Sequence, residues 1–517
     1  MNEALQRAVP PPEPSGASAG AKSKNGAYYV KVIVCILVMM FVGKIPAPEP
    51  ITQIGMTALG LFIGLVALWT LVDITWPTVL VVIFFGAIAP GIWPDSLADA
   101  GGSGWFLTLS YSFGQWNAVF VLNILFLCFL MERTGLARRI ALWFITTKYA
   151  KKGPWSFTFM FLLATFVIGL FFNVSPAQLM LFAIAKEIFG ALGMTKDDKW
   201  THIMYTGITF TVMIGFAATP VAHDITILFM SILQGLAGGL SVNWVAYMAV
   251  TIPVAVIVWF LMFLFFRYCT NCDMSKLENI DFDKIEAMKP TKMNLREKFF
   301  TIGFIALIVV WLAPATIGLF APQAGIVTFF EHITLVTPLL VLLVIFCIVK
   351  IDGEPVLDIS VAASKLNWSV YFMMAGIMLT SNALSADATG IIPFVIMSLG
   401  PIVSGLSPFA FVFTMIVISV ILTNILNNIP VAIILMSAAV PLAMEMGMSP
   451  FVIGVPIMFA SGMAFALPSS FVPVGCCYAE PFGGAKYTIK YGAATMIVAI
   501  VVCGILMYPL STLIFGA

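Results

Sequence analysis

Charged side chains are scarce in this sequence, and their scarcity excludes a water-soluble fold. Asp, Glu, Lys and Arg make up only 9% of the 517 residues, against about 25% in an ordinary soluble domain. Hydrophobic residues make up 61%, and the mean hydropathy is +1.05. The formal net charge is only +1, so no nucleic-acid partner is expected. The composition instead predicts a protein that is integral to the lipid bilayer.

Motifs of pumps and metalloproteins are lacking as well. No G-x-x-x-x-G-K-[ST] loop is present to hold a phosphate, so ATP-driven pumping by this chain is not expected. The eight cysteines are scattered mostly through apolar stretches and do not form a disulfide framework. Cys269 and Cys272 form a C-x-x-C, but no second pair or nearby histidine completes a metal site. Neither an enzymatic cofactor nor a structural metal is therefore expected.

Long apolar runs follow one another along almost the whole chain. Many of them reach or approach the roughly 20 residues that cross a bilayer as a helix. In lipid every backbone polar group must be bonded internally, so these runs predict helices. The predicted fold is an all-α polytopic membrane protein with about 11 transmembrane helices.

One hydrophilic stretch divides the chain nearly in half. The predicted parts are a disordered cytoplasmic tail (1–26), a first membrane half (27–266), a cytoplasmic linker (267–298) and a second membrane half (299–517). Basic residues cluster in the linker and again from Arg133 to Lys152, and the positive-inside rule places both clusters on the cytoplasmic side. By contrast, the uncharged connection from Gly400 to Pro408 is expected on the outer side. The predicted location is the cell inner membrane.

Four apolar segments are interrupted by Pro, Gly, Asn or Ser at mid-depth, where a lipid-facing backbone does not tolerate an open turn. The breaks are at Asn173-Val174-Ser175-Pro176, Thr219-Pro220, Asn427-Asn428-Ile429-Pro430 and Pro468-Ser469-Ser470. The first and third interrupt predicted hairpins near 155–192 and 406–445. Each half thus has the same order of breaks at similar spacing. This order predicts inverted repeats with two re-entrant hairpins, whose broken helices build a substrate site near the midplane.

Several of these residues resemble those of a known transporter family. Part of an early helix pair of this family is similar to Ile74-Thr75-Trp76-Pro77, and its T-G-L motif matches Thr134-Gly135-Leu136 with Arg138-Arg139. In these two motifs the chain resembles the divalent anion/sodium symporter family of the ion transporter superfamily. The likeness covers roughly residues 54–509. It implies a secondary active transporter that moves a di- or tricarboxylate with sodium by alternating access. It also implies a homodimer.

The resemblance carries site residues at the hairpin tips, where the family has two Ser-Asn-Thr triplets that hold sodium and a substrate carboxylate. Here the triplets read Phe172-Asn173-Val174 and Asn427-Asn428-Ile429. Substrate-binding candidates are Asn173, Ser175, Thr219, Asn427, Asn428, Ser469 and Ser470, and cation-binding candidates are Asn173, Thr423, Asn427 and Asn428. The alternative is structural: the amides could join helices, and the hydroxyls could bond to their own backbone.

His223 and Asp224 stand inside an apolar run and are the candidates for proton coupling. Ionisable side chains are costly at that depth and commonly mark ion pathways, and histidine titrates near neutral pH. In the alternative interpretation the two residues lie near an interface, or Asp224 caps a half-helix that starts at Ile225. Coupling to sodium or to protons therefore stays open.

The sequence thus predicts a secondary transporter of a small organic anion. Three other functions compete with this prediction. A cation/proton antiporter of the same superfamily is favoured if Asp224 lies at the midplane. A membrane enzyme would use Ser469 or Ser470 with His223, and a passive channel would not accumulate its solute against a gradient.

Overall fold

The architecture described below is that of a computed structural model of the chain. It describes residues 25–73, 75–94, 96, 103–221, 223–277, 282–288, 292–321, 325–326, 329, 336–366, 368–384, 386–394, 397–398, 405–425, 428–468 and 470–516. The predicted N-terminal tail lies almost wholly outside these residues. Asn427 and Ser469 also lie outside them, as does the side chain of Asp224.

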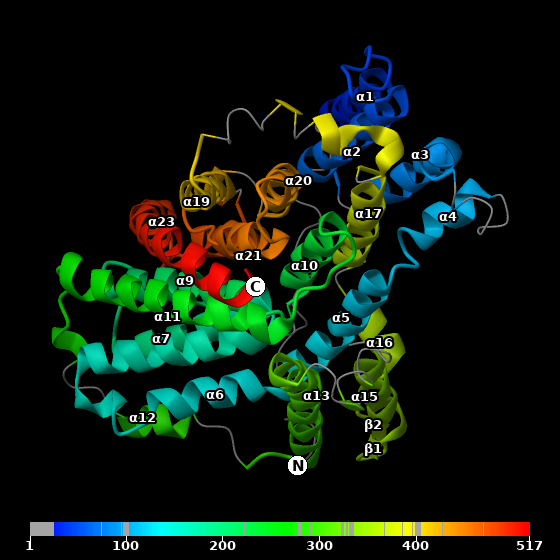
Figure 1. The fold of residues 1–517 in the computed structure, drawn as a ribbon. Helices are drawn as coiled ribbons and strands as arrows, with labels where there is room; N and C mark the ends of the chain where they lie inside the picture. The colour runs from blue at the N-terminus through cyan, green and yellow to red at the C-terminus, as the bar shows by residue number, and fades with distance from the viewer. Residues whose placement is uncertain are drawn as a thin grey trace.

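Helices form nearly all of the first half. Its elements are α1 (Asn25–Val42), α2 (Gln53–Leu71), α3 (Trp76–Ile92), α4 (Gly104–Ser110), α5 (Trp116–Thr134), α6 (Leu136–Ile145), η1 (Ala150–Lys152), α7 (Pro154–Phe171), α8 (Val174–Ala191), α9 (Lys199–Ala218), α10 (Asp224–Leu236) and α11 (Trp244–Cys269). Figure 1 shows α7, α9 and α11 stacked beside one another, with α5 and α10 to one side. In α9 every residue from Trp200 to Ala218 is buried, so this helix lies in the core.

The second half repeats much of this order. Its elements, with those of the linker, are η2 (Ser275–Leu277), α12 (Phe282–Ala287), α13 (Leu295–Phe320), α15 (Val336–Ile348), β1 (Lys350–Ile351), β2 (Glu354–Pro355), α16 (Ile359–Ala363), α17 (Trp368–Leu384), η3 (Asp387–Thr389), α19 (Pro408–Ile425), α20 (Asn428–Glu445), α21 (Pro450–Ser461), α22 (Val472–Ala479) and α23 (Ala485–Phe515). The two strands pair antiparallel. The linker is slightly shorter than predicted, because α11 extends to Cys269 and α13 already begins at Leu295.

Matched breaks recur in the two halves. The helix pairs α7–α8 and α19–α20 consist of four 18-residue helices, and in both pairs the third residue of the second helix is proline, Pro176 or Pro430. Proline has no N–H, and the first turn of a helix does not need one. Gly135 after α5 and Gly390 after η3 also share a left-handed conformation, with φ of 68° and 65°. These features are those expected of internal repeats, and the inverted relation between them stays a prediction.

The membrane character of the helices agrees with the composition. Eight described helices are long and apolar enough to cross a bilayer, and α5 with α6, bent by 53° at Gly135, makes a ninth candidate. Six shorter apolar helices accompany them. The predicted all-helical polytopic membrane protein is thus confirmed. The total of about 11 crossings stays a prediction, because length and composition do not decide which short helices cross.

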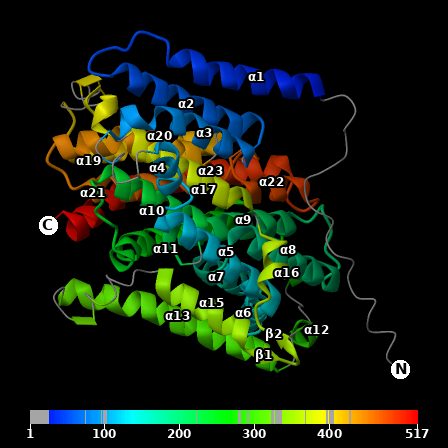
Figure 2. The ribbon, with the colours of Figure 1, turned by 90° about the vertical axis from the view of Figure 1, so that its right-hand side faces the viewer.

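Ion pairs join the two predicted cytoplasmic clusters to each other. Arg139 of α6 binds Glu297 of α13 at 2.9 Å, and Lys151 of η1 binds Glu286 of α12 at 2.9 Å. Figure 2 shows α12 and the β1–β2 pair at one end of the molecule and the C-terminus at the other. The basic cluster and the linker therefore share one face, as the charge distribution predicts.

Candidate functional site

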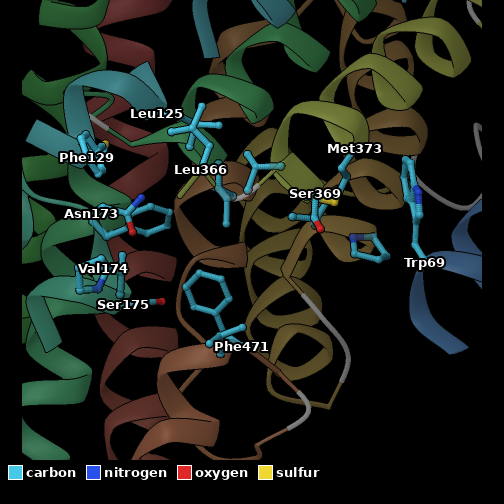
Figure 3. A pocket seen from close by; sticks show the side chains of 18 of the residues that line it. Trp69, Leu125, Phe129, Asn173, Val174, Ser175, Leu366, Ser369, Met373 and Phe471 are labelled. Atoms are coloured by element: carbon cyan, nitrogen blue, oxygen red, sulfur yellow. The ribbon is translucent and has the colours of Figure 1, made fainter. Parts of the chain in front are cut away.

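A cavity of about 780 Å³ lies between the broken helices of the two halves. Small-molecule sites commonly measure about 300–1,000 Å³. Its walls come from α2, α5, α8, α9, α10, α17, α19, α20 and α22, and are mostly apolar. Side chains such as Trp69, Phe129, Phe216 and Phe471 line it, and Figure 3 shows several of them pointing toward the same space.

Four helices begin at this cavity. The lining residues include Val174 and Ser175 in the first turn of α8, Ile225 of α10, Ile429 of α20 and Val472 of α22. The N-terminal end of a helix carries a partial positive charge of roughly half an elementary charge and unbonded N–H groups. Four such ends on one cavity make it attractive to an anion.

The first hairpin tip supplies polar side chains to the cavity wall. Asn173, Ser175 and Ser369 line it, and Figure 3 shows Asn173 and Ser175 on the side of α8 and Ser369 on the side of α17. Asn173 occupies the N-cap position of α8, yet its side chain makes no capping hydrogen bond. Its amide is therefore available to a ligand in the cavity.

The second hairpin tip holds a buried polar cluster behind the cavity wall. The Thr423 hydroxyl lies 2.6 Å from the Ser461 carbonyl and 2.8 Å from Oδ1 of Asn428, and all three residues are buried. In this arrangement Nδ2 of Asn428 and Oγ of Ser461 have no hydrogen-bond partner. The Thr423 hydroxyl has one proton, so it cannot donate to both the Ser461 carbonyl and Oδ1 of Asn428. If the side-chain amide of Asn428 is rotated by 180°, Nδ2 donates to the Thr423 hydroxyl, and this hydroxyl donates to the Ser461 carbonyl. The oxygen of Asn428 is left without a partner, as is Oγ of Ser461.

Asn424 holds the unwound segment between α21 and α22. Its Nδ2 donates to the carbonyls of Met463 at 2.8 Å and Val420 at 2.7 Å. Its Oδ1 accepts from the amides of Phe465 at 2.7 Å and Ala466 at 2.8 Å. A single buried side chain thus satisfies three backbone groups of a segment that has no helical hydrogen bonds of its own.

Gln178 of α8 is a second buried amide that joins separate elements. Its Nε2 donates to the Thr209 hydroxyl and to the Pro473 carbonyl, both at 2.8 Å, while its Oε1 is buried without a partner. The two bonds connect α8 with α9 and with the first turn of α22. Gln178 thereby connects the first hairpin to the broken helix of the second half.

The other predicted site residues do not line the cavity. The Thr219 hydroxyl accepts from the amide of Val221 at 3.0 Å, and the Ser470 hydroxyl donates to the Leu467 carbonyl at 2.5 Å. Both bonds are local, as in the structural alternative. His223 is fully buried, its ring lies near the backbone of Gly169 and Leu170 in α7 without a hydrogen bond of good geometry, and it packs edge-to-face on Phe216 at 4.8 Å between ring centres. Among the described residues, the Ser470 hydroxyl bonds to the Leu467 carbonyl and not to His223.

Comparison with known proteins identifies the family. The profile of the citrate transporter family matches residues 29–464. The chain belongs to the citrate transporter family. It is 23% identical over 403 residues to a sodium-dependent dicarboxylate transporter, SdcS, of Staphylococcus saprophyticus, covering 75% of each chain.

A solved transporter structure shares the overall fold of this chain. The Alcanivorax borkumensis YdaH transporter superposes with a TM-score of 0.52 at 14% identity, over 86% of this chain and 97% of that one. Neisseria gonorrhoeae MtrF gives a TM-score of 0.49 at 14% identity, over 93% and 94%. At these identities the likeness concerns the fold alone.

Membership of the citrate transporter family makes this chain a carboxylate-type transporter of the membrane and not an enzyme. The predicted transport function and multi-pass membrane location are confirmed at this level. The finer resemblance to the divalent anion/sodium symporter family agrees with the relative, although the matching family is that of the citrate transporters.

Six residues at the site were not predicted from the sequence, among them Ser369 and Ser461, whose hydroxyls are ordinary in membrane helices. Asn424 and Gln178 are neutral amides inside apolar runs. Such amides were predicted as site candidates only at the hairpin tips. Lys365 and Glu132 both line the cavity. Each stands near a helix end in the sequence, where a charge is ordinary, so only the fold shows that they share a cavity.

Proposed function

We propose that this citrate transporter family member is a secondary transporter that moves a di- or tricarboxylate, coupled to a cation, by alternating access. The observation that carries the proposal is the convergence of four helix N-termini on one apolar-walled cavity. Such ends favour the carboxylate charge without needing a dedicated arginine at the tips. The printed names of the matching family and of the staphylococcal relative support this substrate class.

Sodium is the favoured coupling ion. Thr423 and Ser461 bring two hydroxyl oxygens and a main-chain carbonyl into a buried cluster next to the second tip, and the turned Asn428 amide leaves its oxygen buried there without a partner. A hard cation takes several oxygen ligands of this kind. Buried oxygens without partners cost free energy, and a bound sodium ion would remove that cost. Asn427, also a candidate ligand, lies outside the described residues.

The arrangement of the halves supports alternating access. The matched breaks of α7–α8 and α19–α20 flank the cavity, and in transporters with inverted repeats one repeat rocks against the other around such a fixed site. Asn424 attaches the unwound segment before α22 to α19, and Gln178 attaches the first turn of α22 to α8. A movement of one hairpin is thereby transmitted to the broken helix beside it.

The direct test is uptake of labelled succinate and citrate into proteoliposomes with an inward sodium gradient or an inward proton gradient. We expect sodium-driven uptake in the native protein and a loss of at least about tenfold in Asn428→Ala, since one ligand of the cation is removed. Asn123→Ala is the matched control, because Asn123 bonds only to its own helix at Val119. Its uptake should remain close to native.

Coupling to protons, as in a cation/proton antiporter, is the second candidate. It is favoured by His223, a buried ionisable side chain that packs on Phe216, which lines the cavity. For a cation/proton antiporter, we expect that neither the sodium gradient nor the proton gradient drives carboxylate uptake. We also expect that His223→Gln abolishes proton flux in proteoliposomes. Carboxylate uptake that depends on sodium in both native and His223→Gln protein would exclude it.

A further inference from the structure

Two charged side chains, Lys365 and Glu132, border a cavity whose other lining residues are apolar or uncharged. Lys365 lies in the turn between α16 and α17, and Glu132 lies in the last turn of α5. Both are exposed, and neither forms an ion pair with any residue in the described part of the chain. The fold does not use these charges for its own packing.

The position of Lys365 complements the hairpin tips. Leu366 and Ser369, which follow it in the chain, line the cavity on the side of α17, and Asn173 and Ser175 line it on the side of α8 (Figure 3). An anion with one charged group fits the helix N-termini alone. An anion with a second charged group extends toward the α17 side, where the Lys365 ammonium supplies three hydrogen-bond donors and a full positive charge.

We propose that Lys365 binds the second carboxylate of the substrate and thereby makes the cavity select dianions over monoanions. This inference rests on the proposed carboxylate transport and names the residue that sets its charge selectivity. Glu132 borders the same cavity with the opposite charge. Glu132 does not form an ion pair with Lys365, and its negative charge at the cavity wall opposes the binding of a second carboxylate.

The two charges make opposite predictions for binding. Isothermal titration of the purified full-length protein would compare succinate with monomethyl succinate, which has the same length but one charge. In Lys365→Met we expect succinate affinity to fall about tenfold or more, as for a lost charge-assisted hydrogen bond, and monomethyl succinate affinity to change less than about twofold. In Glu132→Gln we expect tighter succinate binding. Lys365→Arg should retain most of the native succinate affinity.

Lys350→Met is the matched control, because Lys350 of β1 is exposed but does not line the cavity. If Lys365→Met lowers the affinity for succinate and for monomethyl succinate equally, Lys365 does not bind the second carboxylate specifically, and the inference is overturned. Unchanged succinate affinity in this variant would overturn it as well, while leaving carboxylate transport standing. If the native protein binds neither ligand, the proposed function fails together with this inference.

Discussion

Single amide side chains decide whether the unwound segments of this protein keep their shape. Asn424 satisfies the amides of Phe465 and Ala466 and the carbonyl of Met463, none of which has a helical partner. In a membrane interior no water replaces such partners. The segment between α21 and α22 is therefore specified from a distance, by a residue of α19.

Replacing Asn424 by alanine should therefore disrupt both stability and transport. Two buried backbone N–H groups lose their acceptor, at about 1–3 kcal/mol each, and we expect an unfolding free energy lower by roughly 2 kcal/mol or more. The measurement is thermal unfolding in detergent together with uptake. Asn382→Ala serves as control, because Asn382 bonds only to the Met378 carbonyl of its own helix. Equal stability of the two variants would contradict the structural part assigned to Asn424.

Among the elements, the two left-handed glycines show how similar local structure acquires different packing. Gly135 and Gly390 follow α5 and η3 with nearly the same φ and ψ. A Cβ on Gly135 would meet nothing within 4 Å, whereas a Cβ on Gly390 would lie 2.0 Å from the Pro50 carbonyl oxygen. The segment before α2 is held there by Thr52, which donates its amide to the Thr389 carbonyl at 3.0 Å.

This difference gives a matched pair of substitutions. Gly135→Ala should lower the unfolding free energy by about 1–2 kcal/mol, the cost of a left-handed alanine. Gly390→Ala should lower it by roughly 3 kcal/mol or more, because backbone must also move to relieve the overlap. Denaturant unfolding of both variants in the same detergent measures the difference. Equal effects would mean that the segment before α2 does not pack on Gly390 as described.

At the scale of the whole molecule, ion pairs connect the basic cluster of Arg133 to Lys152, the linker and the membrane helices. Besides the pairs of Arg139 and Lys151, the structure contains Arg138–Glu187, Lys186–Glu480 and Lys276–Asp198 pairs at 2.7–2.9 Å. The side-chain hydrogen bond from Lys276 lowers the pKa of Asp198 below its usual value. Exposed pairs contribute little to stability individually, so their main consequence is that they join the linker to the membrane helices on one face.

The orientation of this face can be tested with the native cysteines. Cys269, at the start of the linker, is exposed, and the other seven cysteines are buried or partly buried. A membrane-impermeant maleimide should modify Cys269 in inside-out vesicles and not in right-side-out vesicles. Cys269→Ser is the control for background labelling. A Gly405→Cys substitution on that background should show the reverse pattern, since the connection before α19 is expected on the outer side. Labelling of both positions from one side would contradict the inverted arrangement.

Much of the fold was predictable because its signals are local. The helix breaks at Asn173 and Thr219 were predicted correctly. Proline and asparagine inside an apolar run mark a backbone interruption, which is tolerated only where it is buried in protein or lines a cavity. The role of Thr219 was harder, because a hydroxyl bonds equally well to a ligand or to its own backbone. Asn173 was predicted to face a ligand, and it lines the cavity. Its binding role and the paired dimer stay predictions.

The sequence by itself determined that this chain is a polytopic helical membrane protein with interrupted helices, because hydropathy and helix-breaking residues act within a few neighbouring positions. Only the tertiary structure decided which interruptions meet at one cavity and which charges border it. Lys365 and Glu132 are more than 230 residues apart in the chain, and no local rule relates them. Packing of α5 and α17 around the hairpin tips brings them together, because long-range contacts between apolar faces determine where exposed side chains finally lie.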